Sequence, residues 1–116
     1  MDSTINVNLL VAQMKLWCIV EGLERPSGIR VGDNDDVDDL KHAIKAQCSP
    51  LFDNIYVAYI KIWRISKSLH EAQQLTVANL EGEEEAPPGI SVGEYWPDLT
   101  AEVHVFIANP LGESMV

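Results

Sequence analysis

Residues 101–110, AEVHVFIANP, decide how the rest of the chain is arranged. In an extended chain, successive side chains point to opposite faces of a sheet. One face of this segment is aliphatic, and the other is apolar apart from a histidine; the two sets are Val103, Val105, Ile107 and His104, Phe106, Ala108. Apolar residues on both faces predict a central strand. Pro110 should end it, because proline cannot donate to a strand ladder. A central strand so near the C-terminus has to pair with strands formed much earlier.

An N-terminal hairpin is the expected partner of this strand. Residues 14–20, MKLWCIV, alternate with apolar side chains on both faces and predict the first strand. Residues 21–28 contain two glycines and a proline, which is typical of a turn, and residues 29–31 predict the second strand. Residues 1–13 are mostly polar, and we expect them to fray or to add an edge strand.

A long helix is predicted after the acidic run DNDDVDD at residues 33–39. Apolar residues recur at helical spacing and indicate a helix over residues 35–47; they are Val37, Leu40, Ile44 and Cys48. The acidic residues come first and the lysines later, which is the order that the helix dipole favours. Asp35 and Asp38 resemble a capping box, and Pro50 should end the helix region.

The second half of the chain predicts one more strand before the last. Residues 57–65 alternate and indicate the third long strand. Ser68 and Glu71 form an S-x-x-E capping signature, followed by apolar spacing that predicts a second, shorter helix. Residues 81–89, EGEEEAPPG, read as a solvated loop, and residues 90–99 as short irregular structure leading into the last strand.

This order predicts an α+β domain with a mixed sheet packed on one long helix, plus a minor second helix. The first and last strands would pair in parallel at the centre of the sheet, which is the β-grasp or ubiquitin-like layout. We expect the domain to span residues 14–110, with an N-terminal extension at 1–13 and a C-terminal tail at 111–116.

Composition narrows the function classes. The chain has 116 residues, with 8 Lys plus Arg against 18 Asp plus Glu, and a formal net charge of −10. This charge repels phosphate backbones, so we expect no binding of nucleic acid by this domain alone. No apolar run approaches the roughly 20 residues needed to cross a bilayer, so we expect no membrane insertion. Proteins remain as the expected partners, with their identity unknown.

No pattern in the sequence predicts a metal, a cofactor or a catalytic centre. The acidic run fails as a calcium loop, because Asp38 stands where the loop needs glycine and Ile44 where it needs glutamate. The three histidines lack metal-site spacing, and the two cysteines read as buried thiols. His104 is interpreted as a partly buried, hydrogen-bonded strand residue. A small enzyme built around His104 and Cys18 is the least favoured hypothesis.

One strand segment carries the residue types that dominate protein interfaces. Trp63 and Arg64 lie in KIWRIS at residues 61–66, and alternation places them on opposite faces. Trp63 is therefore either part of an exposed aromatic and basic patch or a core side chain. The sequence leaves both interpretations open.

Taken in order, these segments resemble the N-terminal header domain of the Crinkler effector family of oomycetes and fungi. MKLWCIV is similar to that family's first strand of the LFC type, VDDLKHAIK at residues 37–45 to its VDDLK-x-AIK helix, and HVFIANP to its closing HVLVxxP motif. The LFLAK signature of the family falls on Ile62, Trp63, Arg64, Ile65 and Ser66. Here Arg64 and Ile65 replace the second leucine and the alanine, and Ser66 replaces the lysine.

The resemblance implies a non-enzymatic ubiquitin-like header module that serves secretion, translocation into host cells or protein interaction, ahead of a separate C-terminal toxic domain. The N-terminus has no clear signal peptide, so the expected route is non-classical secretion with delivery to the host cytoplasm or nucleus. The candidate motif and interaction residues are Lys61, Ile62, Trp63, Arg64, Ile65, Ser66, His104, Val105, Phe106, Ile107 and Pro110. The alternative is a homodimerisation domain that pairs through an edge strand or through residues 1–13.

Overall fold

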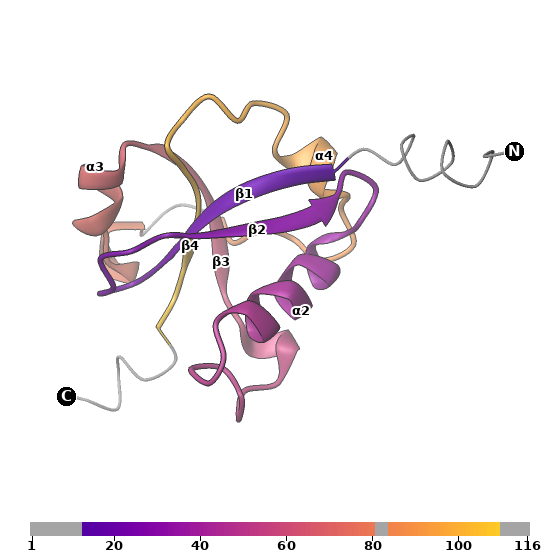
Figure 1. The fold of residues 1–116 in the computed structure, drawn as a ribbon, viewed down its shortest axis with the longest axis horizontal. Helices are drawn as coiled ribbons and strands as arrows, with labels where there is room; N and C mark the ends of the chain where they lie inside the picture. The colour runs from indigo at the N-terminus through magenta and orange to yellow at the C-terminus, as the bar shows by residue number, and fades with distance from the viewer. Residues whose placement is uncertain (1–12, 81–83, 110–116) are drawn as a thin grey trace, which may run out of the picture.

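The computed structural model describes residues 13–80 and 84–109. These form a compact α+β domain around a mixed four-stranded sheet in the order β2-β1-β4-β3 (Figure 1). The strands are β1 (Gln13–Val20), β2 (Ser27–Gly32), β3 (Ile62–Lys67) and β4 (Val103–Ile107). The helices are α2 (Val37–Gln47), α3 (Leu69–Gln73) and α4 (Val92–Tyr95), with 3₁₀ turns η1 (Val57–Tyr59) and η2 (Val77–Leu80). The predictions made for residues 1–12 and for Pro110 and the tail lie outside the described residues.

The strand pairing confirms the expected centre of the sheet. β1 and β2 form the predicted antiparallel hairpin, and β2 is longer at both ends than the three residues expected. β4 pairs with β1 in parallel, with Cys18 opposite Val105 and Val20 opposite Ile107. β3 pairs antiparallel with the other side of β4. The last strand of the chain therefore lies between the first and the third.

The crossover helix α2 starts slightly later than the sequence indicated. Its N-cap is Asp36, whose carboxylate accepts the backbone N–H of Asp39, while the Asp39 carboxylate accepts the N–H of Asp36. The prediction of a capping box at Asp35 and Asp38 is therefore wrong by one residue. Asp35 instead accepts the N–H of Gly32 at 2.8 Å and closes the turn that leaves β2.

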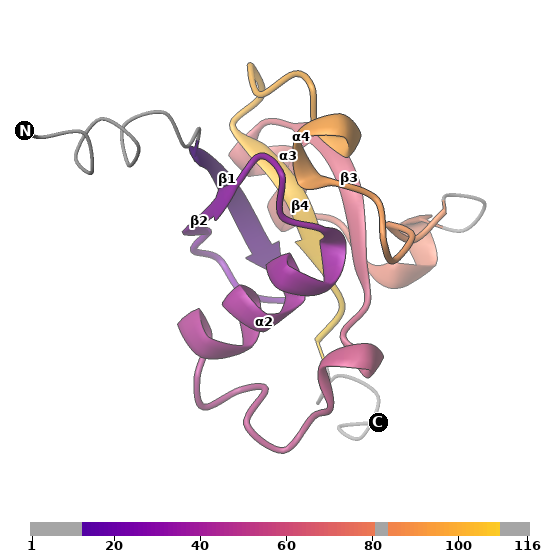
Figure 2. The ribbon, with the colours of Figure 1, turned by 90° about the vertical axis from the view of Figure 1, so that its right-hand side faces the viewer.

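Two hydrophobic cores lie on opposite faces of the sheet. The main core contains residues of α2, Phe52, Ile60 and Trp96 together with one face of the strands, and Figure 2 shows α2 in front of the sheet. The second, smaller core lies against α3 and η2; its buried members are Ile19, Trp63, Ile65, Ala72, Leu80, Val103 and Phe106. All five residues of β4 are buried, which confirms that it is a central strand.

The third strand was predicted in the wrong place. Residues 57–59 form the η1 turn, with Ile60 N–H donating to the carbonyl of Val57, and the strand runs over Ile62–Lys67. Val57 and Ile60 are three residues apart, so the apolar spacing there fits a turn of helix as well as a strand. The turn places Ile60 in the main core and leaves Tyr56 and Tyr59 about three-quarters exposed, at 76% and 72%.

The second helix and the segments after it also differ from expectation. The predicted helix ends early at Gln73, and η2 follows as a separate turn. Residues 90–99 contain the short helix α4, capped by Ser91, which accepts the N–H of Glu94. Residues 84–86 of the predicted solvated loop lie against β3, because Ala86 N–H donates to the carbonyl of Ile62.

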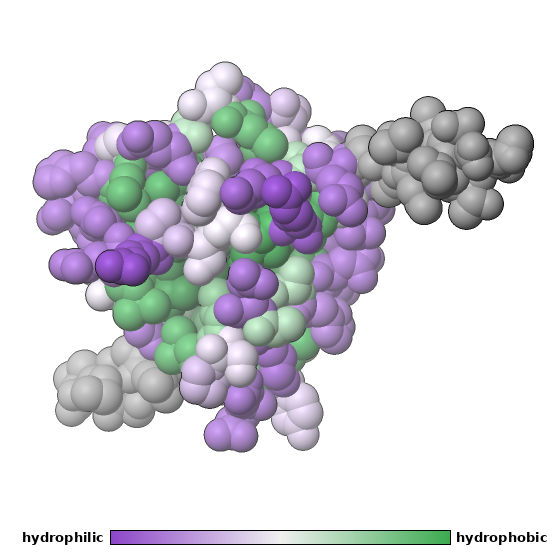
Figure 3. Space-filling model, viewed as in Figure 1, coloured by the Kyte–Doolittle hydropathy of each residue, from purple (hydrophilic) through white to green (hydrophobic). Residues whose placement is uncertain are grey.

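The surface of the domain carries both polar and hydrophobic residues (Figure 3). The face seen in Figure 3 is mostly hydrophilic, with hydrophobic residues in separate patches. Among the described helices, none has the length and apolar character needed to cross a membrane.

Truncation of β4 on either face should destabilise the domain strongly. Ile107→Ala opens the main core and Phe106→Ala opens the second core, and we expect each to lower the free energy of unfolding by about 2–5 kcal/mol. Val77→Ala, at a side chain that is 39% exposed, should change it by less than about 0.5 kcal/mol. Urea denaturation measures all three, and a loss below about 1 kcal/mol for Phe106→Ala would show that the second face is not a core.

Candidate functional site

β3 forms one edge of the sheet, and only the first part of this edge is covered in the described structure. Ala86 N–H donates to Ile62 O at 2.9 Å, and Glu85 forms an antiparallel bridge with Trp63. Among the described residues, no strand pairs with the outer side of β3 beyond Trp63. Among the residues that the structure describes, the edge beyond this bridge, from the Arg64 carbonyl to Lys67, is therefore open.

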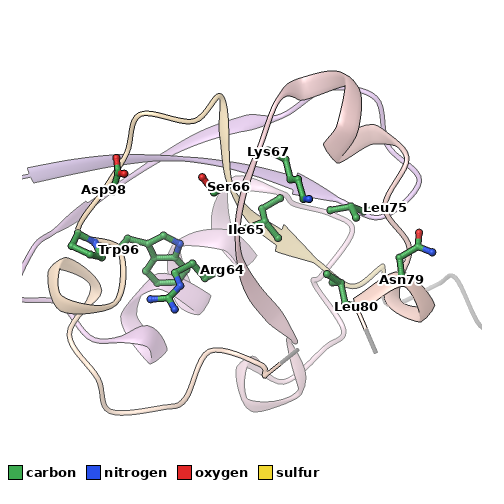
Figure 4. A pocket seen from close by; sticks show the side chains of 10 residues that line it. Arg64, Ile65, Ser66, Lys67, Leu75, Asn79, Leu80, Trp96 and Asp98 are labelled. Atoms are coloured by element: carbon green, nitrogen blue, oxygen red, sulfur yellow. The ribbon is translucent and has the colours of Figure 1, made fainter. Parts of the chain in front are cut away.

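A groove of about 650 Å³ runs along this open edge (Figure 4). Residues 64–67 lie along the groove, and the chain on either side supplies its walls. One wall carries Leu75, Asn79 and Leu80 from the α3 and η2 region, and the other carries Trp96, Pro97 and Asp98 after α4. We call this feature the β3 edge groove.

Arg64 is held in a fixed position at the side of the β3 edge groove. Its Nη1 donates to the carbonyl of Tyr95 at 2.8 Å, and its guanidinium lies 4.4 Å from the centre of the Tyr95 ring. Tyr95 packs edge-on against Trp96, with 4.9 Å between the ring centres. Because the cation–π contact and the hydrogen bond act together, the guanidinium keeps its orientation while remaining exposed.

The structure divides the predicted interaction segment between core and surface. Ile62, Trp63 and Ile65 are buried, whereas Arg64 and Ser66 are exposed on the strand. Trp63 is 6% exposed and packs on Phe106 with 6.0 Å between ring centres, so it is a core side chain. The interpretation of Trp63 as part of an exposed patch is wrong, and Tyr95 is the aromatic partner of Arg64.

Lys61 lies outside the β3 edge groove. Its side chain borders a second hollow of about 430 Å³, which also contains the exposed Tyr56 and Tyr59. These two rings contact each other edge-on, with 6.0 Å between their centres. Lys61 is thus separated from Arg64 by the buried residues between them.

The closing motif has a structural role in this fold. Val105, Phe106 and Ile107 are fully buried, and His104 is 3% exposed. Trp17 N–H donates to His104 Nδ1 at 3.0 Å, so Nε2 carries the proton and donates to the carbonyl of Leu99 at 3.2 Å. The imidazole thus connects β1 to the loop before β4. These residues do not reach the β3 edge groove.

Neither cysteine is prepared for nucleophilic chemistry. Both thiols are free, Cys18 is buried and Cys48 is half-buried. Burial raises the pKa of Cys18 far above its ordinary value, with a smaller contribution from nearby Cys48. Burial also raises the pKa of Cys48, partly offset by a hydrogen bond with Ser27. Within the described ranges, no group of three or more His, Cys, Asp or Glu residues could hold a metal ion.

Sequence reasoning missed one wall of the β3 edge groove and the segment that covers the start of the edge. The wall follows α4, and its sequence signal is S-x-x-E at Ser91 and Glu94, the same signature that marked α3. The pairing of residues 84–86 with β3 has no comparable local signal, because it depends on how the chain returns to the sheet edge.

Comparison with known proteins shows the family of this chain. The family model of the Crinkler effector protein N-terminal domain matches residues 14–108. The chain therefore belongs to the Crinkler effector family as an N-terminal domain. It is 29% identical over 99 residues to Crinkler effector protein 1 of Rhizophagus irregularis, an alignment that covers 82% of this chain and 21% of that relative. The chain thus spans about a fifth of the length of that protein. No solved structure matches it.

Removing the His104 side chain should cost stability because it leaves the Trp17 N–H without its acceptor. We expect His104→Ala to lower the free energy of unfolding by about 1–3 kcal/mol or more, since a cavity also forms. His42→Ala, at an exposed histidine of α2, is the matched control and should cost less than about 0.5 kcal/mol. Nitrogen chemical shifts of His104 in the unmodified protein should correspond to the Nε2–H tautomer. Equal stability of both variants, or an Nδ1–H tautomer, would contradict this role.

The capping box that starts α3 should make Glu71 titrate low. The backbone N–H and the hydroxyl of Ser68 both donate to Glu71 Oε1 at 3.2 Å, and these bonds lower the pKa of the carboxyl below its ordinary value. Because the folded pKa is lowered, this contribution to stability is present at neutral pH and is lost as the pH falls through the folded pKa.

Substitution of Ser68 tests this assignment. Ser68→Ala keeps the backbone donor and removes the hydroxyl, so the pKa of Glu71 should rise part of the way toward its ordinary value. Ser66→Ala, at an exposed serine outside the box, should leave the Glu71 titration unchanged. Carboxyl carbon shifts followed by NMR against pH measure the pKa, and an unchanged pKa in Ser68→Ala would rule out the hydroxyl contribution.

Proposed function

We propose that this protein is a non-enzymatic, ubiquitin-like header module of a Crinkler-type secreted effector. In this proposal it serves secretion or delivery into host cells through a protein partner, ahead of a separate C-terminal effector domain. The observation that carries the proposal is the family match over residues 14–108, which extends from the start of β1 to just beyond β4. The match to a much longer Crinkler effector supports a delivery role for an N-terminal module.

The arrangement of the sheet supports a β-grasp assignment for the module. An N-terminal hairpin, a crossover helix and a last strand inserted beside the first follow that layout. Ubiquitin-like folds host many binding functions on an unchanged scaffold, so the specific function must be sought in surface residues. The β3 edge groove is the surface that we assign to the protein partner, because it combines a hollow lined by polar and apolar residues with an open strand edge.

Non-enzymatic action is supported by the chemistry of the described residues. The buried histidine is hydrogen-bonded on both ring nitrogens, and burial disfavours both thiolates. A general base needs access to the proton that it removes, and a cysteine nucleophile needs the thiolate form. These groups instead stabilise the interior of the domain.

A reporter fusion tests the delivery role directly. Residues 1–116 are fused ahead of a calmodulin-dependent adenylate cyclase and expressed in a Crinkler-producing fungus grown on its host. We expect reporter protein in the culture fluid and cyclic AMP in host cells, both well above the level given by the reporter alone. A second fusion carrying Val105→Asp, which buries an unpaired charge in the main core, should lose both signals because the domain unfolds.

The proposal is overturned if the reporter alone reaches culture fluid and host cells as well as the fusion does. It is also overturned if the unfolded Val105→Asp fusion is delivered equally well, because delivery would then not depend on a folded module.

A further inference from the structure

We propose that the β3 edge groove binds an extended acidic segment of a partner protein, which adds to the sheet as a further strand along residues 64–67. This inference rests on the proposed function, in which the module acts through a protein partner, and it names the chemistry of that partner. In this inference, the edge of β3 and the basic side chains beside it recognise the partner segment.

The backbone of β3 presents hydrogen-bonding groups to the groove. Lys61 O accepts from Ala108 N–H on the β4 side at 3.0 Å, while Ile62 O accepts from Ala86 N–H on the outer side at 2.9 Å. In an antiparallel strand these groups point to alternate sides from one residue to the next. The N–H and C=O of Arg64 therefore point outward, as those of Ile62 do. At the Trp63–Glu85 bridge the N–H of Arg64 faces the chain's own segment 84–86, so at this residue the carbonyl is the group left for an added strand.

The protein already adds a short segment of its own to this edge. Glu85 pairs antiparallel with Trp63, directly before the open part of β3. Glu84 and Glu85 are both exposed, so the segment that this edge accepts is an acidic one. A partner strand would extend this pairing along β3.

Two cations flank the open edge in a chain that is otherwise strongly acidic. Arg64 and Lys67 are exposed at its two ends, while the whole chain has only 8 basic residues against 18 acidic ones. Figure 4 shows Lys67 on the side of Leu75, away from Asp98 on the other wall. Because Asp98 would repel a carboxylate, the acidic side chains of the added strand should lie on the Lys67 side of β3.

The walls of the groove suit the alternation of an extended peptide. Leu75 is partly buried, whereas Leu80 and Trp96, on opposite sides of β3, are only 7% and 2% exposed. Successive side chains of an added strand would point to the two walls in turn. A segment that alternates apolar and acidic residues therefore places its acidic side chains on the Lys67 side of β3 and its apolar ones on the side of Trp96 and Pro97 (Figure 4). A bulge and a lysine also protect sheet edges from pairing with other strands. The peptide titration described next separates this protective role from binding.

The probe is an acetylated and amidated seven-residue peptide of alternating valine and glutamate, titrated into ¹⁵N-labelled residues 1–116. We expect saturable amide shifts concentrated at residues 64–67 and at Ala86. Lys67→Glu should weaken binding by about tenfold or more, because it replaces attraction by repulsion. Lys61→Glu makes the same charge change at an exposed lysine outside the groove and should leave the affinity unchanged.

Two control peptides test the mode of binding. The same peptide with alternate backbone nitrogens methylated cannot donate to β3 and should not bind. A peptide of alternating valine and lysine should bind at least about tenfold more weakly, since its lysines meet Lys67 with like charge. Equal binding of the methylated peptide overturns strand addition, and equal binding of the lysine peptide overturns the acidic preference.

Absence of shifts at residues 64–67 overturns the inference. It is also overturned if the free protein sediments as a dimer that Lys67→Glu dissociates, because a second copy of the chain would then occupy the edge. The reporter fusion separates this failure from failure of the proposed function. If the fusion is delivered and the peptide does not bind, only the peptide inference is overturned. If the fusion is not delivered, the delivery role is overturned, whatever the peptide does.

Discussion

The parallel pairing of β1 with β4 is the constraint on which the rest of this structure depends. Parallel neighbours cannot be joined by a tight turn, so everything between Val20 and Val103 has to form a crossover. β4 also pairs with β3 on its other side and is buried on both faces. Each face then needs its own cover, which α2 supplies for the main core and α3 with η2 for the second.

Because β4 is short, the side chain of His104 makes one of the hydrogen bonds that a longer strand would make with its backbone. The parallel register joins only residues 18–20 of β1 to residues 105–107, so β1 extends beyond the ladder at its N-terminal end. At the next step the imidazole accepts the Trp17 N–H in place of a backbone carbonyl. The carbonyl of His104 accepts from the Trp96 indole at 3.0 Å, which anchors the wall that follows α4. The same residue therefore stabilises the centre of the sheet and one side of the β3 edge groove.

Sequence patterns predicted the elements whose burial is periodic over a whole segment. The hairpin, α2, the all-buried β4 and the parallel pairing followed from alternation or helical spacing, because these elements meet the core along their full length. Residues 57–60 were wrongly predicted as part of a strand, because the spacing of Val57 and Ile60 fits a turn of helix as well as a strand over so short a segment. The site was predicted in part: Arg64 and Ser66 lie on it, but Trp63 is buried. Its Trp96 wall and the pairing of residues 84–86 depend on tertiary contacts between distant segments, which no local pattern records.

The bulge in β3 changes which side chain occupies each place along the edge. Arg64 lies opposite Val105, so a regular antiparallel ladder would place Ser66 opposite Val103. The register shifts between Arg64 and Lys67, and Lys67 takes that place instead. The signature that this segment resembles ends in a lysine where this chain has Ser66, and in this chain the extra residue places Lys67 opposite Val103. The apolar places of the signature that are kept, Ile62 and Trp63, are buried and serve packing. The bulge, which no local sequence pattern marks, therefore decides that Lys67 and not Ser66 lies at this place on the edge.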